Sequence, residues 1–191
     1  MKPFLAGSIA MGLCALLLAW PATVAAAAKY QRSEQTVTLP DVVLVNQDNE
    51  KIPLRSLAES DEVVVVDFIY ATCTTICPIL SAGFANLQRR HNSESVKVRL
   101  VSITIDPEND GPKQLKEYLG RYGAKPGWDF LTGSRADINA VMAAFDAYFP
   151  SKMAHQPLNF IRTADRKTWV RLDGLIGGRD LLQELETTGK Q

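Results

Sequence analysis

The segment at residues 62–70, which reads EVVVVDFIY, constrains the fold more than any other part of the chain. Four consecutive valines favour a β-strand, and a strand without polar alternation is covered on both faces, as in a parallel sheet. A helical pattern follows at residues 75–90, and Pro78 suits its first turn because that position needs no backbone N–H. The apolar positions of this pattern are Ile76, Leu80, Phe84 and Leu87. The sequence therefore predicts a buried strand that leads through a short loop into a helix.

The rest of the chain alternates between strand and helix patterns. Residues 29–60 are expected to be irregular, with short strands and turn residues at 46–50. Further strands are predicted at residues 96–105, 128–131, 158–162 and 169–172, and further helices at 112–122, 135–148 and 180–186. The last two strands form a hairpin, which adds antiparallel strands to an α/β sheet. This order resembles a thioredoxin-like fold with one inserted helix–strand segment, so we predict an α/β fold with a central mixed β-sheet flanked by helices.

Residues 1–28 have the layout of a secretory signal peptide. Lys2 precedes an apolar run at residues 4–20, and a tract of small residues ends at position 28. We expect cleavage there and export across the inner membrane, so that the protein is periplasmic. An uncleaved membrane anchor facing the periplasm is the alternative, although the apolar run is slightly shorter than the ~20 residues that a span requires. Cys14 belongs to this run, and Leu13 before it is too large for a lipoprotein cleavage site.

Residues 29–191 are expected to form a single soluble domain. Their length is ample for one hydrophobic core, and no further segment is long and apolar enough to span a bilayer. The full chain has 21 basic and 21 acidic side chains, and removal of residues 1–28 takes away only Lys2, which leaves 20 against 21, a net charge of −1. This balance argues against a nucleic-acid partner, because such proteins carry a basic face.

Two cysteines, Cys73 and Cys77, lie at the junction of the predicted strand and helix. A disulfide between such near neighbours closes a very small loop and stabilises little, so the pair indicates chemistry rather than a structural crosslink. With Cys73 in the loop and Cys77 in the first turn, both sulfurs face the positive end of the helix, which stabilises thiolates. Two neighbouring thiolates can close a redox-active disulfide, or they can bind a soft metal such as Cu(I), Zn(II) or the iron of an iron–sulfur cluster.

The candidate third ligand is His155. The other histidine, His91, follows two arginines at a helix end and is interpreted as solvated. His155 precedes Pro157 and a predicted strand, and in thioredoxin-like folds the loop that ends in this proline lies beside the cysteine pair; a cis peptide bond is predicted at Pro157. An exposed loop histidine is the alternative. Structural zinc requires four protein ligands and an iron–sulfur cluster usually four cysteines, so two thiolates and one imidazole favour copper, as Cu(I) or Cu(II).

A second motif imitates a calcium-binding loop. Asp106, Asp110, Gly111 and Glu117 have the spacing of such a loop. However, Glu108 stands where a shorter side chain is needed, and an apolar β-like run precedes the loop where an EF-hand requires a helix. We therefore interpret the segment as a strand end followed by a helix cap. Asp106 is still expected near the cysteines, because ligands of open α/β sheets bind beyond the carboxyl ends of strands.

Four sequence blocks resemble the Sco/SenC family of copper chaperones. They are residues 68–78 (FIYATCTTICP), residues 101–110, residues 131–133 and His155, and the resemblance covers about residues 38–187. It implies a thioredoxin fold, copper bound by Cys73, Cys77 and His155, and a role in assembling the copper site of respiratory cytochrome c oxidase. Asp106 matches an acidic residue near the site in relatives. Two departures are Thr74, where many relatives have proline, and the sequence His-Gln-Pro-Leu from position 155, where a His-Ser form is commoner.

The leading hypothesis is a copper chaperone that hands its ion to a cytochrome c oxidase copper-site subunit or to another copper or thiol protein. The alternative is an extracytoplasmic thiol–disulfide oxidoreductase, in which Cys73 attacks a partner disulfide and Cys77 resolves the mixed disulfide. A weaker third option is a peroxide reductase, based on Thr72 before the first cysteine. The sequence leaves open whether the protein is an enzyme.

Overall fold

The computed structural model describes residues 29–91 and 97–188, so the predicted signal peptide lies outside the described residues. The strands are β1 (Tyr30–Thr36), β2 (Val43–Val45), β3 (Lys51–Pro53), β4 (Val63–Ile69), β5 (Val98–Thr104), β6 (Trp128–Leu131), β7 (Leu158–Arg162) and β8 (Thr168–Gly174). The helices are α1 (Arg55–Glu59), α2 (Cys77–Arg90), α3 (Pro112–Arg121), α4 (Arg135–Ala144) and α5 (Gly178–Thr188), with a 3-10 turn η1 (Lys152–Ala154). Within these ranges no helix has the length and apolar character of a membrane span.

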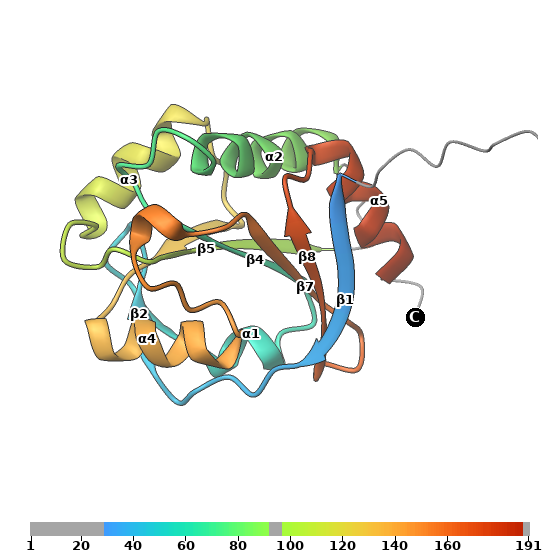
Figure 1. Ribbon diagram of the computed structural model, residues 1–191, viewed down its shortest axis with the longest axis horizontal. Coiled ribbons are helices and arrows are strands. Elements are labelled where there is room, and N and C mark those ends of the chain that lie inside the picture. Colours follow the sequence, from blue (N-terminus) through green and yellow to red (C-terminus); the bar gives the residue numbers. More distant parts are fainter. Residues whose placement is uncertain (1–28, 92–96, 189–191) are drawn as a thin grey trace, which may run out of the picture.

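The valine-rich strand β4 lies in the middle of the main sheet. The described residues form a six-stranded sheet in the order β1-β8-β7-β4-β5-β6, and a separate β2-β3 hairpin. β4 runs parallel to β5 and antiparallel to β7, so the sheet is mixed. Figure 1 shows α2 and α5 along one face of this sheet, and α1 and α4 along the other. The predicted thioredoxin-like architecture, a central mixed sheet flanked by helices, is confirmed.

Aromatic side chains fill both interfaces between the sheet and its helices. Successive residues of a strand point to opposite faces, so Phe68 of β4 packs towards α4. Its ring meets Phe145 edge-on at 5.5 Å, and Phe145 in turn meets Trp169 at 5.0 Å. On the other face Phe84 of α2 packs against Trp128 of β6 at 5.5 Å. These contacts hold β4 against the end of α4 and α2 against β6, and the cysteine loop connects β4 to α2.

Three elements differ from the sequence prediction, the first being α1, a short helix in a segment predicted to be irregular with short strands. Tyr30–Thr36 forms the edge strand β1, which pairs with β8 although its side chains are mostly polar and exposed. Helix α4 ends at Ala144, four residues before the predicted end at 148. Asp146 adopts a left-handed backbone with φ 50, and the Ala147 N–H donates to the Met142 carbonyl at 2.8 Å. A left-handed residue at this position ends a helix because it turns the chain back on the last carbonyls.

Candidate metal centre

The loop between β4 and α2 carries both cysteines. Cys77 is the first residue of α2, and Cys73 lies in the preceding turn. The backbone N–H of Cys77 donates to the sulfur of Cys73 at 3.4 Å, so a free N–H at the helix start points at the first sulfur. Both cysteines are reduced and buried. The sulfurs therefore meet at the helix terminus, where the backbone dipoles favour a thiolate.

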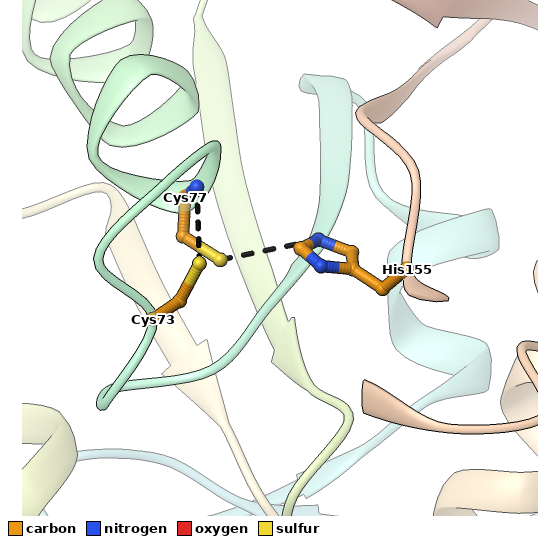
Figure 2. Close-up of side chains that lie close together, drawn as sticks. All are labelled: Cys73, Cys77 and His155. Carbon is orange, nitrogen blue, oxygen red and sulfur yellow. Dashed lines mark hydrogen bonds between the residues drawn. The ribbon is translucent and has the colours of Figure 1, made fainter. Parts of the chain in front are cut away.

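His155 faces the cysteines from the opposite side, as Figure 2 shows. It lies between η1 and β7, and its Nε2 atom is 3.9 Å from the Cys77 sulfur and 3.1 Å from the Phe68 carbonyl oxygen. The nearest ligand atoms of Cys73, Cys77 and His155 all lie within 4.8 Å of one another. The fold thus brings together the three side chains that the sequence singled out as metal ligands.

The predicted cis bond at Pro157 is wrong, because the described residues contain no cis peptide bond. His155 has an extended backbone, with φ −66 and ψ 142, and the chain enters β7 from this conformation. The imidazole therefore reaches the cysteines on an extended, all-trans segment.

Burial and hydrogen bonding give the three groups different proton affinities. Burial alone would raise the pKa of Cys73, but hydrogen bonds from Cys77 and Thr75 outweigh it and lower that pKa. Burial raises the pKa of Cys77, and its hydrogen bond with Cys73 adds to the rise. Burial also lowers the pKa of His155, against the opposing effect of the Phe68 carbonyl. Cys73 is therefore the sulfur that ionises first, and the imidazole is neutral near pH 7.

This donor set suits a soft ion of low coordination number. It contains two sulfurs and one neutral imidazole, and among the described residues it has no fourth cysteine, histidine or carboxylate member. Structural zinc sites are closed by four protein ligands. Thiolates favour Cu(I), zinc and iron–sulfur clusters, and imidazole suits copper; of these ions, Cu(I) is the one that a set of three ligands satisfies. The residues present therefore fit copper.

Asp106 lies outside this cluster and contacts the segment that leads to His155. Its carboxylate binds the Lys152 ammonium at 2.5 Å, and it also accepts from the Asn109 side chain. Lys152 belongs to η1, three residues before His155. Asp110, from the calcium-like motif, accepts from the Ala71 N–H at 3.0 Å. Asp106 thus connects the segment after β5 to η1, which precedes His155. Asp110 connects the same segment to the cysteine loop.

Asp67 is a buried acidic residue near the cluster that the sequence analysis missed. Its side chain is fully buried on β4, and neither carboxylate oxygen has a hydrogen-bond partner. Burial raises its pKa to about 7, and its charge is one of the causes, after burial, that raise the pKa of Cys77. The sequence did contain a signal for this residue: Asp67 directly follows four valines of a predicted buried strand. Such a position is unusual, because ionisable groups are rarely buried without a partner.

Tyr70 is a second neighbour of the cluster that the sequence did not reveal. Its ring meets the His155 ring edge-on at 5.7 Å, and its hydroxyl donates to the Met153 sulfur at 3.8 Å. Burial raises the pKa of Tyr70 to about 12, and the neighbouring charge of Cys73 adds to this effect. Tyr70 therefore stands between the histidine, the first cysteine and the η1 segment.

The chain matches one known protein family over most of its length. The family model described as SCO1/SenC matches residues 31–187. The SCO1 protein homolog of Bacillus subtilis is 45% identical over 95 residues, which cover 49% of this chain and 48% of that protein. The chain thus spans about half the length of the curated relatives it matches.

Solved structures show the same likeness. BsSco, described as a member of the Sco family of cytochrome c oxidase assembly proteins with a disulfide switch, has a TM-score of 0.69 and 30% identity. The alignment covers 83% of this chain and 96% of BsSco. Copper-bound yeast Sco1 has a TM-score of 0.66 at 19% identity, covering 78% of this chain and 86% of its own, and it shares the fold.

Proposed function

We propose, from the premise that this chain belongs to the SCO1/SenC family, that it is a copper chaperone for the assembly of cytochrome c oxidase. The observation that carries the proposal is the convergence of Cys73, Cys77 and His155, whose ligand atoms lie within 4.8 Å of one another. Two soft sulfurs and an imidazole bind copper strongly, yet three ligands leave the ion accessible to a ligand from a partner protein.

Copper uptake proceeds in an order set by the proton affinities of the ligands. Cys73 ionises first and offers the first thiolate, because its pKa is lowered. Cys77 keeps its proton until the metal displaces it, so uptake releases a proton to solvent. His155 is neutral, and its Nε2 can bind once the hydrogen bond to the Phe68 carbonyl is broken and the ring proton has moved from Nε2 to Nδ1. Delivery reverses these steps while ligands of the partner replace those of the chaperone.

The partner we propose is the copper-site subunit of cytochrome c oxidase, because BsSco is described as an assembly protein of that oxidase. We further propose that residues 1–28 direct export, so that the protein works in the periplasm, either released or anchored. Residues 29–191 then act as one copper-binding domain.

Thiol–disulfide exchange is a second candidate function, favoured by the unequal sulfurs of the site. Cys73 has a lowered pKa, as an attacking thiolate requires, and Cys77 lies beside it as a resolving thiol. The relative BsSco is described as having a disulfide switch. This function would use the two cysteines without copper.

Replacement of His155 by alanine separates the two functions. For the reduced wild type we expect one Cu(I) per chain, and for His155→Ala an affinity at least ~10-fold lower, because one of three ligands is lost. The measurement is an anaerobic titration against a chromophoric Cu(I) chelator. His91→Ala, which changes a histidine at the end of α2, is the matched control and should bind like wild type.

The result that would contradict copper transport is equal affinity in the wild type and His155→Ala. If His155→Ala also exchanges disulfides with a model substrate at the wild-type rate, the second candidate function replaces the first. Exchange depends on the two thiols, so it should be largely indifferent to the imidazole.

A further inference from the structure

The most exposed large apolar side chain among the described residues belongs to Met153, with 80% of its surface accessible. The other methionine in the described ranges, Met142, is 3% exposed and packs in the core. Methionine side chains usually fill gaps in a hydrophobic core. An exposed methionine contributes no such packing to the stability of the fold. The position of Met153 therefore invites an explanation other than packing.

Met153 is close to His155 in the sequence and contacts Tyr70, a neighbour of the His155 ring. It is the middle residue of η1, two positions before His155. The Tyr70 hydroxyl donates to its sulfur at 3.8 Å, and the ring of the same tyrosine contacts the His155 ring at 5.7 Å. One aromatic side chain thus lies between the thioether and the proposed imidazole ligand.

We infer that Met153 is a further copper-binding residue, whose thioether takes up Cu(I) at the mouth of the site and passes it to the sulfurs of Cys73 and Cys77. This inference rests on the proposed function. A thioether is a soft ligand that prefers Cu(I), and it carries no proton. Its sulfur is exposed and can bind the ion at once, whereas the Nε2 atom of His155 must first give up its hydrogen bond with the Phe68 carbonyl.

The surroundings of Met153 anchor its backbone while most of its side chain stays exposed. Lys152 is tied to Asp106 at 2.5 Å, and its ammonium lies 5.5 Å from the Tyr70 ring centre. This ion pair also compensates a positive charge that would repel an incoming Cu(I) ion. The methionine side chain has three rotatable bonds, so its sulfur can swing from solvent towards the cluster.

The transfer step is a ligand exchange without electron transfer. The bond between Cu(I) and the Met153 sulfur breaks as the bond to the Cys73 thiolate forms, and the Cys77 proton leaves to solvent when the second thiolate binds. Copper remains Cu(I) throughout, so no oxidant or reductant is required.

Uptake kinetics of Met153→Leu test the inference, because leucine keeps the volume and apolar character of the side chain but removes the sulfur. We expect Cu(I) uptake from a bicinchoninate complex, followed by stopped-flow absorbance, to slow by about 10-fold. The equilibrium affinity should stay close to wild type, since the final ligands are unchanged. Met142→Leu, which removes the buried thioether, is the matched control and should take up copper at the wild-type rate.

A spectroscopic measurement detects the thioether contact directly. In the full chain carrying Cys73→Ser and Cys77→Ser and labelled with methyl-13C methionine, Cu(I) should shift the Met153 methyl resonance and leave that of Met142 in place. The two signals are assigned from their loss in the leucine variants. An unshifted Met153 signal together with unchanged uptake by Met153→Leu overturns the inference alone. Failure of the wild type to bind Cu(I) overturns the proposed function and this inference together.

Discussion

Replacement of Cys77 by serine should lower the affinity for Cu(I) by more than ~100-fold. Loss of a group that only supports a metal ligand costs up to ~100-fold, and Cys77 is itself a proposed ligand. Cys77 is fully buried, and it supplies one of only two sulfurs in the cluster. A serine hydroxyl is a hard, weakly acidic oxygen donor, which Cu(I) does not favour. Cys73 and His155 would remain as the only two members of the cluster.

The measurement is the same anaerobic competition titration, with circular dichroism to confirm that the variant is folded. Cys77→Ala serves as a second variant, because a buried serine hydroxyl can itself perturb the structure. Thr74→Ser changes an exposed residue of the same loop and is the control that should bind like wild type. Wild-type affinity in both Cys77 variants would mean that copper binds elsewhere on the chain.

Asp67 should make the stability of the reduced, metal-free protein fall as the pH rises. In the unfolded chain its carboxyl ionises near 3.8, whereas burial raises the pKa in the folded protein to about 7. Between these pH values the folded state binds more protons than the unfolded state, so the free energy of unfolding decreases with pH. The contribution is fully present below the unfolded pKa and is lost as the pH rises through the folded pKa.

The corresponding variant is Asp67→Asn, which has no charge to bury at any pH. The free energy of unfolding of wild type minus that of Asp67→Asn should decrease by about 4 kcal/mol across this window, at about 1.4 kcal/mol per pKa unit. Urea titrations at several pH values give the difference. Asp165→Asn is a control of opposite sign, because hydrogen bonds from Thr163 and Thr168 lower the pKa of Asp165, whose contribution is therefore lost as the pH falls. If the difference in unfolding free energy between wild type and Asp67→Asn did not change with pH, the Asp67 carboxyl would not be buried away from water in the folded protein.

Much of the site was readable from local sequence. The valine run, the loop and the first turn of α2 are consecutive in the chain, so strand propensity and helical periodicity predicted where the two cysteines would lie. The edge strand β1 was not predictable in this way, because its polar sequence has no alternation and its strand character comes from pairing with β8. The premature end of α4 was equally hidden, since it depends on the left-handed backbone of Asp146.

The chemistry of the site could be predicted from local patterns alone: two thiols at the start of a helix, one candidate imidazole, and a family resemblance that implies copper. The approach of His155 could not be predicted in this way: it lies 78 residues after Cys77, and the folded sheet brings its Nε2 within 3.9 Å of the Cys77 sulfur. Packing of the folded chain also buries the Asp67 carboxylate away from water. It places the Tyr70 hydroxyl against the Met153 sulfur. Local sequence sets the conformation of neighbouring residues. Which distant side chains meet, and which are desolvated, depends instead on how helices pack on the two faces of the sheet.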